Sequence, residues 1–200
     1  FVSILICAQF DKPITNNSTL HIVNTHPTKK SIISNVLSSQ FITNSSSSTL
    51  TFDNVIINGN SIVKNGSSSS LGISNSELRA TNTAIENVGT ITINNTIIEG
   101  TTYAVYDASS SANSTISNSD LISSNTGLYA NGTGKIVIED TDITGTTNVN
   151  NSNAQIKISK NSNSTVELKG RIYNKGQLEI KNAKLSYSFN DYSSVNYIIA

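Results

Sequence analysis

An apolar residue recurs about every 21 positions through most of the chain. The hexapeptides ISNSEL and ISNSDL, at 73–78 and 116–121, are two copies of this unit. The steps are 20 to 23 residues long, and a composition rich in Ser, Thr and Asn does not by itself produce a fixed register. A repeat of this length predicts a solenoid, in which each unit buries its apolar face against its neighbours. The repeated positions are Phe52, Ile73, Ile93, Ile116, Ile138, Ile158 and Ile180.

The residue two positions after each repeated apolar residue is Asn in five of the seven units. Asn tolerates the left-handed backbone conformation better than other non-glycine residues, which suits a sharp turn between two strands. Asn side chains stacked at one height can also hydrogen-bond along the stack. We therefore predict a structural asparagine ladder made by Asn54, Asn75, Asn95, Asn118 and Asn182.

Two further apolar positions in each unit predict two more short strands per coil. One falls five residues after the repeated residue, and the other falls ten to fourteen residues after it. Alternation in runs such as 90–93 and 135–138 is the pattern of strands with one buried face. The predicted second-strand positions are Ile57, Leu78, Ile98, Leu121, Ile143, Asn163 and Leu185, and the predicted third-strand positions are Ile62, Ile85, Val105, Leu128, Val149 and Ile172.

The segments ITINNTIIEGTTYAVYD (91–107) and TISNSDLISSNTGLYANG (115–132) resemble the repeats of right-handed parallel β-helix proteins of the pectin-lyase-like superfamily. The resemblance covers about residues 50–185. It implies an all-β chain folded as a right-handed parallel β-helix (a solenoid) with coils of about 20–23 residues. A leucine-rich repeat is the alternative with the same period, although it places its Asn three residues after the last apolar position instead of two.

The two ends of the chain differ from the regular part. Residues 1–8 are mostly apolar and uncharged, and they resemble the end of a signal peptide, with a buried first strand as the alternative. For residues 9–49, where the repeat is loose, we predict irregular N-terminal coils or a cap. For residues 50–200 we predict regular coils, and we expect their apolar end, 197–200, to be continued by more chain or covered by a partner. We expect an extracellular or cell-surface protein that can associate end to end.

The charge of the chain argues against one class of partner. The formal net charge is zero, and Arg79 and Arg171 are the only arginines. A nucleic-acid-binding surface needs clustered cations, so we expect no nucleic-acid partner. No apolar stretch is long enough to cross a bilayer, so we expect no transmembrane span in this sequence.

An acidic group is the best candidate for chemistry. Asp120 and Asp142 share one register position on successive coils, Glu77 shares it two coils earlier, and Asp140 lies on the coil of Asp142. Carboxylates one strand spacing apart can hold Ca²⁺, or one of them can have a raised pKa and act as an acid. The resemblance implies related chemistry, because pectate lyases group carboxylates around calcium and pectin hydrolases use several Asp. The alternative is a set of solvated side chains on an outer face, with no cofactor.

A row of tyrosines is the best candidate for binding. Tyr106, Tyr129 and Tyr173 each directly follow a third-strand apolar position, so strand alternation turns them outward. Tyrosine rings offer flat apolar faces with polar tips, which suit stacking on sugar rings. The alternative is that stacked tyrosines only stabilise neighbouring strands.

These features favour an extracellular β-helix module with a structural or adhesive role, which presents its outer face to carbohydrate or to another cell surface. A polysaccharide lyase or glycoside hydrolase of the pectin-lyase-like type is the alternative, but its catalytic residues are only weakly marked. The chain also holds nine N-x-Ser/Thr sequons. On a eukaryotic secretory route, turn positions such as Asn65 and Asn131 are the expected sites of glycosylation.

Overall fold

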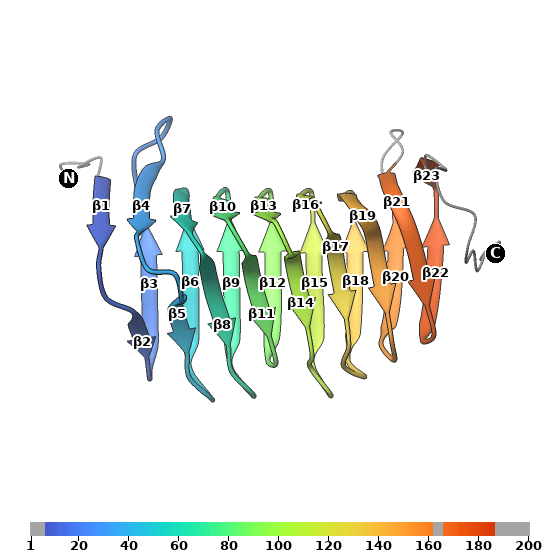
Figure 1. Ribbon diagram of the computed structural model, residues 1–200, viewed down its shortest axis with the longest axis horizontal. Helices are drawn as coiled ribbons and strands as arrows, with labels where there is room; N and C mark the ends of the chain where they lie inside the picture. Colours follow the sequence, from blue (N-terminus) through green and yellow to red (C-terminus); the bar gives the residue numbers. More distant parts are fainter. Residues whose placement is uncertain (1–6, 162–165, 187–200) are drawn as a thin grey trace.

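The computed structural model describes residues 7–161 and 166–186, which contain only strands, turns and connections, with no helix. The strands pair in parallel and stack into a β-solenoid of about eight turns. Figure 1 shows the coils side by side along the long axis, with the strands running across it. The prediction of an all-β parallel β-helix is confirmed. No helix in the described residues is therefore long and apolar enough to cross a membrane.

The first face of the solenoid contains the repeated apolar positions found in the sequence. Phe52 lies beside Ile73, Ile73 lies beside Ile93, and this register continues coil by coil to Ile180. Each repeat unit is therefore one coil. The strands of this face are β3 (Thr19–Val23), β6 (Thr49–Asp53), β9 (Ser70–Ser74), β12 (Thr90–Asn94), β15 (Asn113–Ser117), β18 (Lys135–Glu139), β20 (Gln155–Ser159) and β22 (Gln177–Lys181).

The second and third faces belong to one 15-stranded sheet, because two long strands, β19 (Asp142–Asn151) and β21 (Val166–Asn174), run from one face into the other. The other strands of the second face are β1 (Cys7–Phe10), β4 (Ser31–Asn35), β7 (Val55–Gly59), β10 (Glu77–Ala80), β13 (Ile97–Gly100), β16 (Asp120–Ser123) and β23 (Ala183–Ser186). Those of the third face are β2 (Ile14–Asn16), β5 (Gln40–Asn44), β8 (Ser61–Asn65), β11 (Thr83–Asn87), β14 (Tyr103–Asp107) and β17 (Thr126–Ala130).

The core lies between these faces. Strands of the first two faces fill it with alternating side chains, whereas most strands of the third face bury two consecutive residues. Ile91 and Ile93 of β12 are fully buried, while Thr92 between them is exposed. Two predicted core positions need correction. Val63, and not Ile62, is in register with Ile85, although both are buried. Leu168 lies beside Ile143 and takes the place predicted for Asn163, which lies outside the described residues.

The corner between the first and second faces is a sharp turn made by Asn and a hydroxyl residue. All five Asn residues singled out in the sequence have positive φ, between 49° and 56°, and Asp140 has the same conformation. In four coils the next residue is a buried Ser or Thr, whose hydroxyl donates to the carbonyl two residues earlier. The same hydroxyl accepts a backbone N–H from the preceding coil. These hydroxyl residues are Ser76, Thr96, Ser119 and Thr141.

The predicted ladder between the turn asparagines is largely absent from the described residues. Only Asn95 and Asn75 are joined, with Nδ2 of Asn95 donating to Oδ1 of Asn75 at 2.8 Å. Asn118 donates to Asn94, and both Asn54 and Asn182 donate to backbone carbonyls. Most of these side chains are exposed, so water can satisfy them and nothing requires them to bond to each other.

A different set of Asn side chains forms a ladder inside the solenoid, where the strands of the third face end. Each Nδ2 donates to Oδ1 of the Asn on the next coil at 2.7–2.8 Å, and Asn87 donates to Oδ2 of Asp107 at 2.6 Å. A buried amide without partners costs about 1–3 kcal/mol, so these bonds are what allow Asn in an apolar interior. This buried amide ladder consists of Asn16, Asn44, Asn65, Asn87 and Asp107, and then of a second segment, Asn151 and Asn174.

Ala130 occupies the ladder position between the two segments, in register with Asp107 and Asn151. Both carboxyl oxygens of Asp107 are acceptors, Oδ2 from Asn87 and Oδ1 from Ser109, so the series of donors stops at Asp107. The backbone nitrogen and the hydroxyl of Ser109 lie 3.0 and 2.6 Å from Oδ1. The methyl group of Ala130 therefore follows a side chain that has no hydrogen left to donate.

The N-terminal region belongs to the same stack. Cys7 and Ala8, the last residues of the predicted signal-peptide remnant, are part of β1 and pair with Ile32 and Ile33. Residues 1–6 lie outside the described residues, as does the apolar end at 197–200. Within 9–49, predicted as irregular coils or a cap, β3 pairs with β6 so that Leu20 lies beside Leu50.

Candidate functional site

Three tyrosines on two successive coils gather on the outside of the third face. Tyr106 of β14 and Tyr129 of β17 are register partners, and their ring centroids are 5.3 Å apart with the planes at 71°. Tyr103, at the start of β14, lies 5.6 Å from each of them. All three rings are half-buried, so each keeps part of its surface in solvent. We refer to Tyr103, Tyr106 and Tyr129 as the tyrosine cluster.

The cluster has a polar edge. Nδ2 of Asn131 donates to the Tyr106 hydroxyl at 3.3 Å, and the Tyr129 hydroxyl lies 3.5 Å from Oδ1 of the same Asn. On the coils before the cluster, the same outward row continues as an ion pair between Lys64 and Glu86, at 2.9 Å. Aromatic faces are therefore flanked by amide and charged groups on one continuous outer surface.

Tyr173 is separated from the cluster. Asn150 lies between Tyr129 and Tyr173 in the outward row. The three predicted tyrosines are therefore not continuous, because only Tyr106 and Tyr129 are neighbours. The Tyr173 hydroxyl instead lies 3.4 Å from a guanidinium nitrogen of Arg171.

Tyr103 was not predicted. A regular strand would turn residues three apart to opposite sides, so alternation gives no signal for Tyr103. In β14 the successive residues Ala104 and Val105 are both buried, which breaks the alternation and leaves the two tyrosines on the same outer side.

Asp120 and Asp142 are register partners on β16 and β19, on the outside of the second face. Burial, and then the negative charge of Asp142, raises the pKa of Asp120. Asp142 accepts the backbone N–H of Glu167 at 2.7 Å. The two aspartates are therefore an adjacent acidic pair in which one carboxyl holds its proton more strongly than usual.

Glu77 and Asp140 have cationic partners. Ile97 stands between Glu77 and Asp120 in the outward row. A hydrogen bond from Lys30, at 2.9 Å, together with the charges of Lys30 and Arg79, lowers the pKa of Glu77. Asp140, at the turn, forms an ion pair with Lys160 at 3.4 Å.

Among residues 7–161 and 166–186, no three His, Cys, Asp or Glu side chains converge on a position that could hold a metal ion. The acidic pair supplies two carboxylates side by side, whereas Ca²⁺ takes six to eight oxygen ligands. If calcium binds here, most of its ligands must be water or substrate oxygens.

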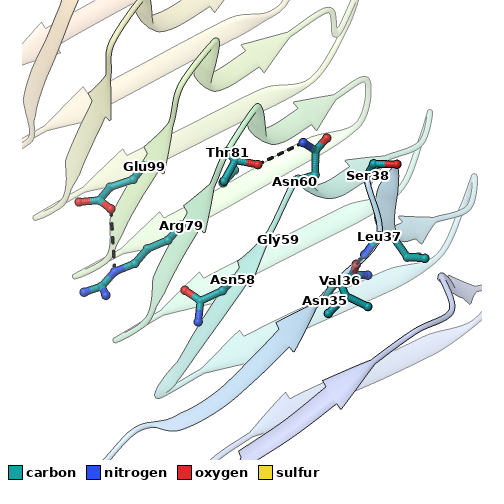
Figure 2. A pocket seen from close by; sticks show the side chains of 11 residues that line it. Asn35, Val36, Leu37, Ser38, Asn58, Gly59, Asn60, Arg79, Thr81 and Glu99 are labelled. Atoms are coloured by element: carbon teal, nitrogen blue, oxygen red, sulfur yellow. Dashed lines mark hydrogen bonds and ion pairs between the residues drawn. The ribbon is translucent and has the colours of Figure 1, made fainter.

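A groove lined by both polar and apolar groups crosses the corner between the second and third faces, and no sequence pattern pointed to it. The connections after β4, β7 and β10 form its walls, and Figure 2 shows their side chains around it. Its volume is about 520 Å³. It is lined by Asn35, Val36, Leu37, Ser38, Asn58, Gly59, Asn60, Arg79, Ala80, Thr81 and Glu99.

The structure separates the two turn sequons singled out above. Asn131 is exposed, as expected for an acceptor of a glycan. Asn65 is fully buried, and its amide donates to Asn87 and to the carbonyl of Thr90. The expectation of a glycan on Asn65 is wrong for the folded chain, because an Asn-Gly pair at the end of a strand resembles a turn but here is part of the buried amide ladder.

Comparisons with known proteins do not assign the chain to a family. No protein-family model matches it, and no curated protein has significant sequence similarity to it.

Proposed function

We propose that this protein is an extracellular or cell-surface β-helix with a structural and adhesive role, and that its tyrosine cluster binds carbohydrate. The observation that carries the proposal is the contact among Tyr103, Tyr106 and Tyr129 on one outer surface. Partly exposed aromatic rings offer apolar area to the C–H faces of sugars. Asn131 at the edge offers an amide donor and acceptor to sugar hydroxyls.

Several other features support this assignment. The solenoid is regular, its surface has few charges, and the resemblance of its repeats to the right-handed pectin-lyase-like β-helices is part of the proposal. A stack of coils also holds a binding surface at a distance from its point of attachment, as a stalk requires. The polar, Asn-rich composition agrees with placement outside the cell.

A glycan array probed with the purified chain tests the proposal. We expect binding to a subset of glycans, and a loss of about tenfold or more in affinity in Tyr106→Ala and in Tyr129→Ala, since anchoring aromatic side chains dominate such contacts. Tyr173→Ala is the matched control, because it removes the same side chain from the same face outside the cluster. Equal effects of all three substitutions, or no binding at all, would exclude the tyrosine cluster as the site.

The alternative function is that of a polysaccharide lyase or glycoside hydrolase acting at Asp120 and Asp142. It is favoured by one observation, the raised pKa of Asp120 beside a second carboxylate, which suits a general acid. Incubation with a panel of polyuronates and Ca²⁺, followed by the absorbance of unsaturated products and by a reducing-sugar assay, tests it. Turnover that disappears in Asp120→Asn and in Asp142→Asn would establish the enzyme and contradict a purely adhesive role.

A further inference from the structure

The hydroxyl ends of two rings in the tyrosine cluster converge on one side chain. Tyr106 of β14 and Tyr129 of β17 are register partners on successive coils, with ring centroids 5.3 Å apart. Nδ2 of Asn131 donates to the Tyr106 hydroxyl at 3.3 Å, and the Tyr129 hydroxyl donates to Oδ1 of the same Asn at 3.5 Å. Nδ2 and Oδ1 are bonded to one carbon atom, so the two phenol ends are held close together. The ring carbons next to the hydroxyl-bearing carbons are therefore brought near each other.

The composition of the chain offers an oxidant few other targets. Cys and Met are the side chains whose sulfur is most readily oxidised, and Trp is the other aromatic residue that readily loses an electron. The sequence contains no Met, no Trp and a single Cys, against seven Tyr. That cysteine, Cys7, lies in β1 on the second face, whereas the tyrosine cluster lies on the third. An oxidant that reaches the third face therefore meets tyrosine as its most reactive side chain, and the half-buried rings of the cluster are accessible to it.

The tyrosine pair bridges a coil boundary that lacks a buried amide bond. Tyr106 directly precedes Asp107, and Tyr129 directly precedes Ala130. Asp107 and Ala130 are the register partners at which the first segment of the buried amide ladder stops. A covalent bond between the two rings would join these coils on the outer surface, where the core supplies no side-chain hydrogen bond between them.

We propose that Tyr106 and Tyr129 are a site of oxidative cross-linking, at which a haem peroxidase using hydrogen peroxide joins the two rings into a dityrosine and fastens the two coils together. The inference goes beyond the proposed function, because the cross-link requires no bound sugar.

The chemistry of the step balances. Each ring loses one electron and its hydroxyl proton, which gives two phenoxyl radicals, and hydrogen peroxide takes up both electrons and both protons to become two water molecules. A carbon–carbon bond then forms between one carbon beside the hydroxyl-bearing carbon of each ring. The hydrogens of those two carbons move to the oxygens and restore both phenols, so the product has two hydrogen atoms fewer than the two tyrosines. Two radicals held in contact couple far faster than two that must meet by diffusion.

The test treats the purified full chain, in dilute solution, with a haem peroxidase and hydrogen peroxide. The chain is then unfolded and digested with a protease that cleaves before Asp. Tyr106 and Tyr129 fall in separate peptides, 53–106 and 120–139, because Asp107 and Asp120 lie between them. We expect the monomer to yield a new species with the summed mass of these two peptides less two hydrogen atoms.

Conservative variants locate the bond. Tyr106→Phe and Tyr129→Phe each keep a ring but remove the hydroxyl from which the radical forms, so each is expected to reduce the yield of this species at least tenfold. Tyr103→Phe is the matched control, because it removes a hydroxyl from the same cluster and the same peptide as Tyr106. It is expected to leave the yield unchanged. Circular dichroism of each variant before oxidation confirms that it is folded.

Two further measurements separate a built site from random oxidation. Oxidation in urea should reduce the yield at least tenfold, since the rings are no longer held together. The cross-linked chain should unfold at a higher temperature than the untreated chain, because a bond between coils restricts the unfolded state.

The proposal is overturned by an absence of the cross-linked species, by its persistence in Tyr106→Phe or Tyr129→Phe, by its loss in Tyr103→Phe, or by cross-links that form only between two chains. An equal yield in urea or an unchanged unfolding temperature would overturn it as well. Glycan binding is measured on the untreated chain, so neither experiment decides the other.

Discussion

The side-chain amide of Asn87 donates a 2.6 Å hydrogen bond to the carboxylate of Asp107, and the first segment of the buried amide ladder ends there. The bond joins two coils inside the core, where neither group meets water. This bond is shorter than the amide–amide bonds of the ladder, which are 2.7–2.8 Å long. The exchange of Asn for Asp at this one coil gives the next coil no donor.

Removing an amide from the middle of the ladder should destabilise the fold. Asn65→Ala deletes the acceptor of Asn44 and the donors to Asn87 and to the carbonyl of Thr90. We expect the free energy of unfolding in urea to fall by about 2–3 kcal/mol. Asn131→Ala, which alters an Asn-Gly pair at an exposed turn, should change the free energy of unfolding by about 0.5 kcal/mol or less. Similar values for both variants would contradict a structural role for the buried ladder.

The ladder can be made continuous by two substitutions acting together. Ala130→Asn alone places a side-chain amide between two acceptors, the Asp107 carboxyl on one coil and Oδ1 of Asn151 on the next. The new amide has one NH₂ group and one oxygen, so in either orientation its oxygen faces one of these acceptors and is repelled by it. With Asp107→Asn added, each amide can donate to the next. We expect the double variant to be more stable than the sum of the single changes by about 1 kcal/mol or more, measured in a double-mutant cycle. A coupling energy near zero would mean that the ladder side chains act independently.

The acidic pair should make stability depend on pH. The pKa of Asp120 is raised in the folded state above its ordinary value of 3.8, so the folded chain binds this proton more tightly than the unfolded chain. Stability from this group is therefore fully present below that ordinary value and is lost as pH rises through the raised pKa. Asn at position 120 has no proton to lose between pH 3 and pH 7, so Asp120→Asn should remove this pH-dependent loss of stability. The variant should therefore be more stable than the parent chain at pH 7 and not at pH 3.

Urea unfolding at the two pH values measures this difference. Asp140→Asn is the matched control, because Asp140 is paired with Lys160 and its replacement should not stabilise the chain at pH 7. Equal stability changes for Asp120→Asn at pH 3 and pH 7 would show that the pKa of Asp120 is not raised in the folded chain.

A single inserted residue should discriminate between strands and turns. Insertion between Ile91 and Thr92 turns one of the two buried Ile side chains of β12 outward, because strand side chains alternate in direction. Insertion between Ser67 and Ser68, two exposed turn residues, only lengthens a connection. We expect the first variant to lose its cooperative thermal transition and the second to keep it. Equal tolerance would contradict the assignment of β12 as a core strand.

The regular coils were predictable from the sequence because three independent signals share one period. The register from Phe52 to Ile180 and the positive φ of the turn Asn residues both follow from that period. The buried ladder was not predictable in the same way. Asn65 precedes Gly66, and this dipeptide is typical of an exposed turn, so only the register of the third strand distinguishes the two environments.

The third-strand register was also the weakest part of the prediction, with Ile62 aligned in place of Val63. Both residues are buried, so hydrophobicity alone does not separate them. The same limit applies to the candidate sites. Asp120 and Asp142 could be paired from their spacing, whereas the groove depends on how the connection around Asn35 folds over the next two coils, which no local pattern describes.

The bonds between coils, both backbone and amide, point along the long axis of the solenoid (Figure 1). A pulling force applied at its two ends would therefore load these bonds in tension, and every coil boundary would carry the whole force. The two boundaries at Ala130 lack the amide bond that reinforces most of the others. In single-molecule stretching we expect the coils to separate first at this position, which would limit the force that the rest of the solenoid carries.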